Sequence, residues 1–270
     1  MSFNVRGFSS PVDGRLRWSR RAGLNADVVR GQAPDVLGVQ ELQAEALATY
    51  REQLPGYGLV LGPAAGTRRR PEYNAILYDP DRLEVLDADG FWLSETPDVP
   101  STAWGSRNIR TAHGVTFRHV NTHLDHWSAL ARQRGAELLL RRADGGLPTV
   151  VTGDFNCPAD SAPHRSFLAE GFEDTHLAAG GDGGQDEATF HGFGGVRSRV
   201  VRSFHRARTG RAPLRLDWIL VGGPGRAWSV EAAAIVRDRD PATGAPPSDH
   251  DPVVADLRLE GPQRPGGTRQ

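Results

Sequence analysis

Residues 148–157 constrain the fold of this chain more than any other stretch. Residues 149–152 are all β-branched, which predicts a buried strand. Gly153 then allows a sharp change of direction, and Asp154 and Asn156 follow at the C-terminal end of the strand. Open α/β sheets place their chemistry at that end. We therefore expect a sheet protein whose functional site includes this stretch.

Asp154 and Asn156 have side chains that can act together on one phosphate group. A carboxylate can take a proton from water, and an amide can donate to a phosphate oxygen. The alternative is a strand followed by an Asx-stabilised turn without a catalytic role. These residues alone leave both interpretations open, so the rest of the chain has to decide.

The size and charge of the chain limit what it can be. With 270 residues, it is long enough to bury a large core, and we expect one domain over residues 1–260 and a disordered tail over 261–270. The formal net charge of −1 argues against a protein that coats nucleic acid by bulk attraction. Cys157 is the single cysteine, which excludes an internal disulfide. No leader or membrane-spanning stretch is evident, so we expect a cytoplasmic monomer.

Hydrophobic periodicity and turn residues predict alternating helices and strands along the chain. We expect helices over residues 19–32, 44–54, 127–142 and 162–170. We expect strands over residues 2–6, 36–41, 58–62, 72–78, 83–93, 114–123, 149–152, 216–221, 229–236 and 253–259.

Many of these strands carry a polar residue at or next to one end, which predicts that the strand ends converge on one rim. The residues are Asn4, Glu41, His123, Asp154 with Asn156, Asp217, and Asp249 with His250. Hard oxygen ligands mixed with imidazoles, without cysteine thiolates, favour Mg²⁺ or Mn²⁺ over structural zinc.

The motifs around these residues resemble, in order, those of the endonuclease/exonuclease/phosphatase superfamily. They read Ser-Phe-Asn4-Val, Val-Gln-Glu41, Asn-Thr-His123-Leu, Gly-Asp154-Phe-Asn156, Leu-Asp217-Trp-Ile and Ser-Asp249-His250-Asp-Pro. The resemblance spans roughly residues 2 to 259 and implies an α/β/β/α sandwich of two packed mixed β-sheets, with the active site at one edge.

The resemblance also implies roles for these residues. Glu41 is the expected principal ligand of a magnesium or manganese ion, with Asn4 and Asp249 beside it. Asp154 would orient and deprotonate the attacking water, and Asn156 and His123 would donate to phosphate oxygens. Asp217 would orient His250, whose imidazolium stabilises the charged phosphorane. Glu72 is expected to hold His123 in a similar way.

Other residues are candidates for contacts with substrate or for structural roles. We expect Arg107 and His191 to contact substrate, together with Arg199 and Arg202 from residues 197–215, where seven arginines occur without an acidic residue. Such a stretch can bind a polyanion, although it can also be a solvated loop. His113, His119, His126 and His164 have no motif context and are expected to be structural or solvated, and Cys157 a packed thiol.

The sequence therefore predicts a divalent-metal-dependent phosphoesterase. Both a phosphodiester, as in a nuclease, and a small phosphomonoester remain open as substrates. Because the chain lacks a lipid-inserting hairpin and net positive charge, a small phosphate or single-stranded nucleic acid is favoured. The alternative from another class is a binding module that keeps the fold with weak catalysis.

Overall fold

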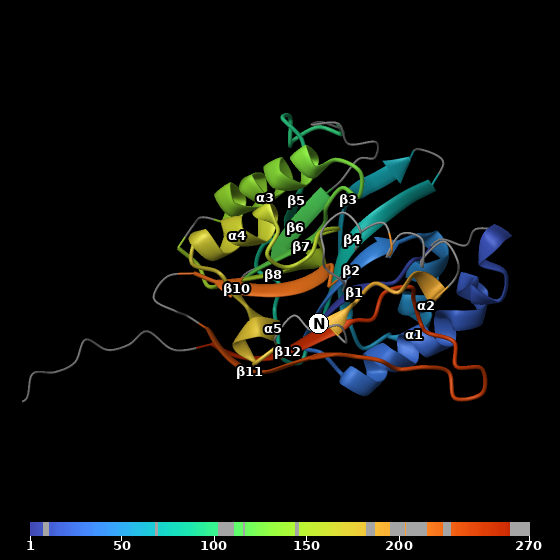
Figure 1. The fold of residues 1–270 in the computed structure, drawn as a ribbon. Helices are drawn as coiled ribbons and strands as arrows, with labels where there is room; N and C mark the ends of the chain where they lie inside the picture. The colour runs from blue at the N-terminus through green and yellow to red at the C-terminus, as the bar shows by residue number, and fades with distance from the viewer. Residues whose placement is uncertain are drawn as a thin grey trace, which may run out of the picture.

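A computed structural model describes residues 1–7, 11–67, 70–101, 111–115, 117–143, 146–181, 187–194, 203, 215–223 and 228–259. Two mixed sheets of six strands pack face to face (Figure 1). The order in the first is β11 (Trp228–Ile235), β12 (Val253–Leu259), β1 (Ser2–Asn4), β2 (Val36–Leu42), β4 (Arg70–Tyr78), β3 (Gly58–Thr67). The order in the second is β5 (Asp89–Trp92), β6 (Thr111–Val115), β7 (Arg118–His123), β8 (Thr149–Asp154), β10 (Asp217–Gly222), β9 (Glu173–Asp174).

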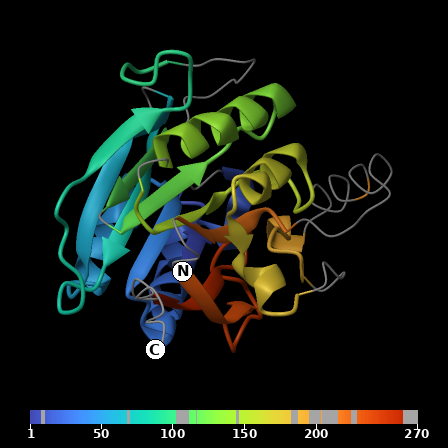
Figure 2. The ribbon, with the colours of Figure 1, turned by 90° about the vertical axis from the view of Figure 1, so that its left-hand side faces the viewer.

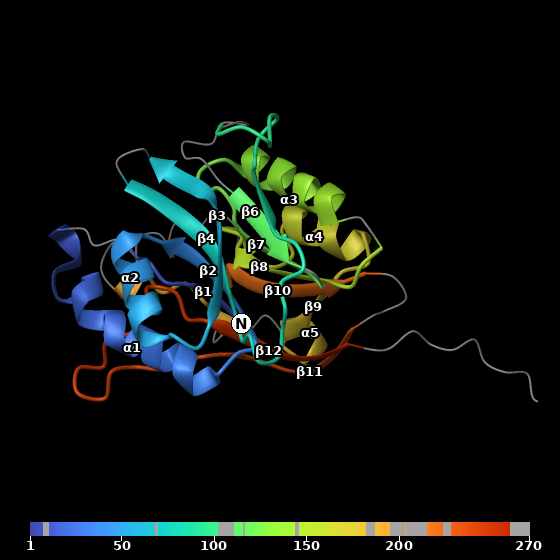
Figure 3. The ribbon, with the colours of Figure 1, turned by 180° about the vertical axis from the view of Figure 1, so that it is seen from behind.

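Helices cover the outer face of each sheet, which confirms the predicted α/β/β/α sandwich. α1 (Trp18–Gln32) and α2 (Ala44–Gln53) cover the first sheet, and α3 (Ala129–Ala143) and α4 (Ala162–Ala169) cover the second (Figure 3). From the side, the green helix α3 and the blue helices lie on opposite sides of the strands (Figure 2). Shorter elements are η1 (Pro11–Leu16), α5 (Thr175–Ala178) and η3 (Gly192–Gly194).

Alternation along the strands separates two kinds of core. On β2, Leu37 and Val39 belong to the apolar cluster under α1 and α2. Gly38 and Gln40 face the other sheet instead, because successive side chains of a strand point to opposite faces. A Cβ atom at Gly38 would lie 2.2 Å from Thr152 Oγ1 of β8, so the two sheets approach closely here. The helix-facing layers are therefore apolar, while the centre between the sheets is partly polar.

Asn121 of β7 connects the two sheets at this polar centre. Its Nδ2 atom donates to the carbonyl oxygens of Val39 at 2.8 Å and Ala75 at 2.9 Å, and its Oδ1 accepts from Gln40 Nε2 at 2.6 Å. All of these residues are buried. Both polar atoms of the Asn121 amide are paired across the sheets, and paired buried polar groups fix the relative placement of the elements they join. The network thus sets the register of the sheets next to the strand ends that carry the predicted site.

Two of the expected strands were predicted wrongly. In place of one strand over 114–123, β6 ends at Val115 and β7 begins at Arg118, and the two pair antiparallel; within 83–93 only Asp89–Trp92 is a strand. Residues 58–62 begin a longer strand, β3, which continues to Thr67 with a register shift between Leu61 and Ala64. Turn residues within an alternating pattern are weak signals of a strand end, since partner strands decide where pairing stops.

In the part of the chain that is described, no helix could cross a membrane.

Candidate active site

Strand register brings the predicted residues of the second sheet together. His123 of β7 pairs with Asp154 of β8, and Asp154 pairs with Asp217 of β10. All three lie at the same edge of the sheet and are buried. Their alternation places them between the sheets, where Asn4 ends β1 of the first sheet. The predicted convergence of strand ends is therefore confirmed for these residues.

Glu41 reaches the same site through an irregularity in β2. The pairing of β2 with β4 shifts register between Val39 and Leu42, and Glu41 has a left-handed backbone with φ of 56°. A bulge re-aims the side chains of its strand. Glu41 Oε1 thereby accepts a hydrogen bond from Asn4 Nδ2 at 3.0 Å. Glu41 and its neighbour Gln40 therefore both face the second sheet. Simple alternation would have turned Glu41 toward the helices.

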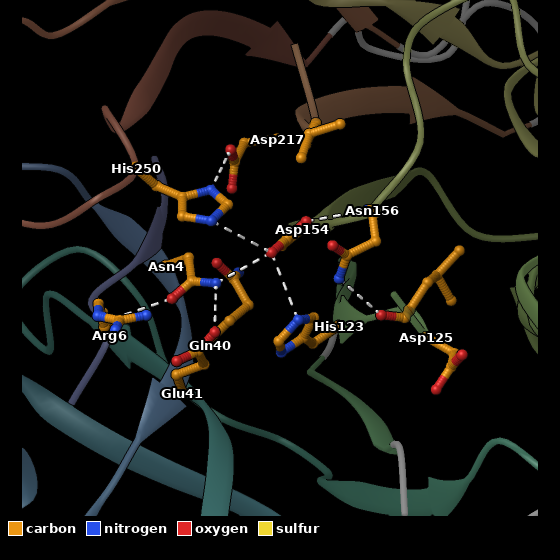
Figure 4. A network of polar contacts seen from close by, with 12 residues as sticks. Asn4, Arg6, Gln40, Glu41, His123, Asp125, Asp154, Asn156, Asp217 and His250 are labelled. Atoms are coloured by element: carbon orange, nitrogen blue, oxygen red, sulfur yellow. Dashed lines mark hydrogen bonds and ion pairs between the residues drawn. The ribbon is translucent and has the colours of Figure 1, made fainter. Parts of the chain in front are cut away.

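Asp154 is the centre of the site (Figure 4). Its Oδ2 atom accepts from Asn4 Nδ2 at 2.9 Å and lies 3.4 Å from His123 Nε2 and 3.7 Å from His250 Nε2. Its Oδ1 atom accepts from the backbone nitrogen of Asn156 at 2.9 Å. Burial raises the pKa of Asp154 to about 7, with Asp217 adding to the rise, while His250 and the hydrogen bonds oppose it. A carboxylate with such a pKa can take up a proton near neutral pH.

His250 and Asp217 form a close buried pair beside Asp154. The Nδ1 atom of His250 lies 2.8 Å from Asp217 Oδ2. Burial opposes the charged ring, but Asp217 and Asp154 together raise the pKa of His250 well above its usual value. The ring therefore carries its proton at neutral pH and points Nε2 toward Asp154. The expected pairing of Asp217 with His250 is present in the structure.

Asn156 is held with its backbone in the left-handed region, at φ of 49°. Asparagine tolerates this conformation better than most residues. Its Nδ2 atom donates to the carbonyl oxygen of Leu124 at 2.9 Å. That bond fixes the amide beside Asp154, and the predicted donation to a phosphate oxygen would use the second hydrogen of the same nitrogen.

One cluster of acidic and histidine side chains among the described residues could hold a divalent cation. Asp154, Asp217 and His250 have donor atoms within 4.8 Å of one another. The predicted ligands Glu41, Asn4 and Asp249 form a different group, and their role as ligands stays a prediction. In the first group, His250 Nδ1 already faces Asp217, while Asp217 Oδ1 is buried without a hydrogen-bond partner among the described residues. Oxygen donors dominate both groups, which suits Mg²⁺ or Mn²⁺.

Arg6 is a member of the site that sequence reasoning missed. Its guanidinium donates to Asp249 Oδ2 and to Asp13 Oδ1, both at 3.0 Å, and lies 5.4 Å from the centroid of the Phe193 ring. Its backbone is left-handed, with φ of 44°, and its N–H donates to Asn4 Oδ1. A basic residue two positions after Asn4 was the available signal, but its acidic partners are distant in the sequence.

Arg21 of α1 was also missed, and it joins the two segments that carry Asn4 and Asp249. This buried guanidinium donates to the carbonyl oxygens of Val5 at 2.7 Å and Pro247 at 2.9 Å, and also to that of Arg6. Burial lowers the pKa of Arg21 to about 10, so it stays charged at neutral pH. Arg21 therefore ties the end of β1 to the loop before Asp249.

The remaining predicted residues have different outcomes. His191 is part of an ion-pair cluster around Asp251. Glu72 lies half-buried on β4, and its support of His123 stays a prediction. Arg107, Arg199 and Arg202 lie outside the described residues, as do His113's side chain and the tail 261–270. Arg215 at the end of the arginine-rich stretch is buried and pairs with Asp174, so its charge is already compensated.

Several histidines and the cysteine have structural surroundings, as expected. His164 Nε2 lies 2.7 Å from Asp174 Oδ2, and its ring packs edge-on against Trp218. His119 Nε2 lies 2.8 Å from Thr152 Oγ1 between the sheets. Burial raises the pKa of Cys157 to about 12, so its thiol is not a nucleophile at neutral pH.

Two packed mixed sheets that share one polar edge define the DNase I-like class of α/β proteins. The chain belongs to the endonuclease/exonuclease/phosphatase family, whose model matches residues 1–250. Members of this family are phosphoester hydrolases. The resemblance inferred from the motifs is thereby confirmed.

Solved structures of similar proteins cover nearly the whole chain. A mannosyl-6-phosphatase of Bacteroides thetaiotaomicron is 26% identical with a TM-score of 0.77, covering 96% of this chain and 98% of that one. A family protein of Bacteroides vulgatus is 27% identical with the same TM-score, covering 96% and 97%. TDP2 of D. rerio, solved with a single-strand DNA product, is 16% identical with a TM-score of 0.68, covering 96% and 97%, and shows the fold alone.

One curated sequence matches over a shorter stretch. The protein L388 of Acanthamoeba polyphaga mimivirus is 28% identical over 135 residues. The match covers 47% of this chain and 50% of that protein, so it spans about half the length of this relative.

Proposed function

We propose that this protein is a divalent-metal-dependent hydrolase that cleaves phosphate esters by in-line attack of water. The observation that carries the proposal is the surrounding of Asp154 Oδ2, with an amide and two imidazoles within 3.7 Å of one carboxylate oxygen. Two imidazoles and an amide around one buried carboxylate oxygen provide the donors that a phosphate group needs beside a group that can take a proton from water.

Each residue around Asp154 has its own role in the proposed reaction. Asp154 orients a water molecule and takes its proton, which its raised pKa allows. His250, protonated through Asp217, stabilises the negative charge that develops on the phosphate oxygens, and His123 donates from the opposite side. Asn156 contributes its amide hydrogen to a phosphate oxygen. No covalent intermediate is required, because the attacking group is water.

A divalent cation fits the oxygen donors of the site. Glu41, Asn4 and Asp249 would hold it, with Arg6 adjoining Asp249. When bound, Mg²⁺ or Mn²⁺ supplies positive charge to the phosphate oxygens. Glu41 and Asp249 belong to different strands or loops of one sheet edge, so the cation would also order the site.

The substrate is proposed to be a small phosphate ester. The similar protein of Bacteroides thetaiotaomicron acts on a mannosyl 6-phosphate, and its structure covers 96% of this chain. The formal net charge of −1 also disfavours a long nucleic-acid backbone. A sugar phosphomonoester is therefore the first substrate to test, and single-stranded DNA the second.

The test is hydrolysis of p-nitrophenyl phosphate and bis-p-nitrophenyl phosphate with Mg²⁺, Mn²⁺ or EDTA. We expect metal-dependent turnover that EDTA abolishes, and a kcat about 10²-fold or more lower for Asp154→Asn. Asp81→Asn is the matched control, because Asp81 is exposed in the turn after β4, at the end of the sheet opposite to Glu41. Turnover that persists in EDTA would contradict the metal requirement. No turnover on any phosphate ester would favour the alternative, a binding module.

A further inference from the structure

Arg6 holds one carboxylate oxygen of Asp249, which the proposed function takes as a cation ligand. The Nη1 atom of Arg6 donates to Asp249 Oδ2 at 3.0 Å, and its Nη2 atom donates to Asp13 Oδ1 at 3.0 Å. The side chains of Asp249 and Asp13 are 8% and 5% exposed, so both carboxylates are almost fully removed from water. Hydrogen bonds between charged groups are strong in such surroundings. The guanidinium is therefore fixed on two sides.

The other oxygen of Asp249 has a weaker partner among the described residues. Ser248 Oγ lies 3.4 Å from Asp249 Oδ1 but only 2.7 Å from the carbonyl oxygen of Asn4. A serine hydroxyl carries a single hydrogen, which the shorter bond to Asn4 uses. Oδ1 is therefore the oxygen through which Asp249 can bind a cation while Arg6 holds Oδ2.

The ring of Phe193 packs on the same guanidinium from an unusual backbone conformation. Arg6 Cζ lies 5.4 Å from the centroid of the ring, which is within the range of a cation–π contact. Phe193 has φ of 58° and ψ of 15°, and it lies between Gly192 with φ of 57° and Gly194 with φ of 70°. Successive left-handed residues are rare, and a bulky residue is disfavoured among them. Such a conformation persists where its surroundings fix it.

The main chain of Asp249 holds this left-handed turn in place. Its carbonyl oxygen accepts from the backbone nitrogens of His191 at 3.0 Å and Gly192 at 3.1 Å. The turn presents the Phe193 ring to Arg6, and Arg6 in turn holds the Asp249 side chain. The backbone nitrogen of Arg6 also donates to Asn4 Oδ1 at 3.0 Å (Figure 4). We call Arg6 and Phe193 the Asp249 clamp, because together they fix this one carboxylate.

We propose that the Asp249 clamp favours Mg²⁺ over Ca²⁺ at the site. The inference rests on the proposed function, in which Asp249 is a cation ligand. Ca²⁺ takes roughly six to eight oxygen ligands and accepts both oxygens of one carboxylate, whereas Mg²⁺ demands near-octahedral geometry, which a carboxylate bound through both oxygens distorts. Because Arg6 occupies Oδ2, Asp249 offers one oxygen, and this suits the smaller ion. Phe193 is a positioning residue that acts through Arg6.

The test measures the affinities of Mg²⁺ and Ca²⁺ by displacement of Mn²⁺, with free Mn²⁺ followed by electron paramagnetic resonance. In Arg6→Met, we expect the ratio of Mg²⁺ affinity to Ca²⁺ affinity to fall by about fivefold or more, because Asp249 can then bind Ca²⁺ through both oxygens. The two ions carry the same charge, so the loss of a positive neighbour affects both affinities alike and cancels in the ratio.

Phe193→Leu tests the ring without changing any charge. We expect the ratio to fall in the same direction as in Arg6→Met, but by less, because the guanidinium keeps its hydrogen bonds. Phe193→Tyr keeps an aromatic face and should restore the ratio of the unmodified protein. The double variant Arg6→Met with Phe193→Leu should match Arg6→Met alone, because the ring acts through the guanidinium.

Two arginine contacts outside the site supply matched controls. Arg82→Met removes an arginine that pairs with Asp35. Phe91→Leu removes a ring whose centroid lies 5.1 Å from Arg142 Cζ. Both variants should keep the ratio of the unmodified protein.

An unchanged ratio in Arg6→Met, or loss of both cations there, would overturn the clamp, because Arg6 would then act by charge or by general support. If Arg6→Met does not fold, the ratio in Phe193→Leu decides in the same way. An unmodified protein that binds no divalent cation would overturn the clamp as well. If the ratio shifts as expected and no phosphate ester is hydrolysed, the proposed function fails while the clamp stands. Metal-dependent hydrolysis with an unchanged ratio gives the reverse result.

Discussion

The Nδ1 atom of His250 lies 2.8 Å from Asp217 Oδ2, and both side chains are buried. Asp217 ends the pairing of β10 with β8, while His250 comes from the loop before β12 in the other sheet. The pair therefore joins the two sheets at the site. Because the carboxylate keeps the ring protonated, neither residue is expected to act alone.

We expect Asp217→Asn and His250→Ala each to lower kcat by about 10²-fold, and the double variant to lose little more than His250→Ala. Asp217→Asn should also lower the pKa of His250, because it removes a negative charge that raises it. The measurements are kcat against pH and the NMR titration of His250. Losses that multiply in the double variant would show that the two residues work independently.

Replacing Glu41 should weaken cation binding and leave the fold unchanged. Glu41→Gln keeps the size of the side chain and its contact with Asn4 but removes the charge. We expect Mn²⁺ affinity, measured by calorimetry, to fall by about tenfold or more, or about 1.4 kcal/mol. Glu45→Gln on the exposed face of α2 is the control. The same Mn²⁺ affinity in Glu41→Gln and the unmodified protein would exclude Glu41 as a ligand.

Arg21 is expected to position the proposed ligands Asn4 and Asp249. Lysine at this position keeps a charge but cannot donate to Val5, Arg6 and Pro247 at once. Arg21→Lys should therefore lower Tm and also reduce Mn²⁺ affinity at a temperature where the variant is folded. The exposed neighbour Arg20→Lys should change neither. Reduced stability with normal Mn²⁺ affinity would mean that Arg21 stabilises the fold only.

Asp174 should contribute stability that depends on pH. Burial opposes its charge, but hydrogen bonds from His164 and Arg215 lower the pKa of Asp174 from 3.8 to about 2. The folded state thus binds the proton less tightly than the unfolded state. The contribution, about 2 kcal/mol, is present above pH 4 and is lost as pH falls from about 4 to 2.

The check is urea unfolding of Asp174→Asn and the unmodified protein between pH 7 and pH 2. The difference in the free energy of unfolding should be largest at pH 7 and shrink toward pH 2. Asp238→Asn, an exposed aspartate, should show no such difference. A difference that does not change with pH would assign the effect to lost packing or hydrogen bonds.

The sequence by itself determined the strand ends and their chemistry. Residues 149–154 predict their strand and its site because β-branched runs and terminal polar residues are local properties. The ordered motifs also identified the family and its sandwich fold. The hairpin of β6 and β7 was missed, since strand ends depend on partner strands that local pattern does not contain.

Only the tertiary structure decided which distant groups meet. Glu41 enters the site through a bulge that changes the face of β2, and alternation alone would have excluded it. Arg6 meets Asp249, and Arg21 meets Pro247, across more than two hundred residues of chain. The raised pKa of Asp154 arises from burial between two sheets. Such contacts depend on how the sheets pack, which no single segment encodes.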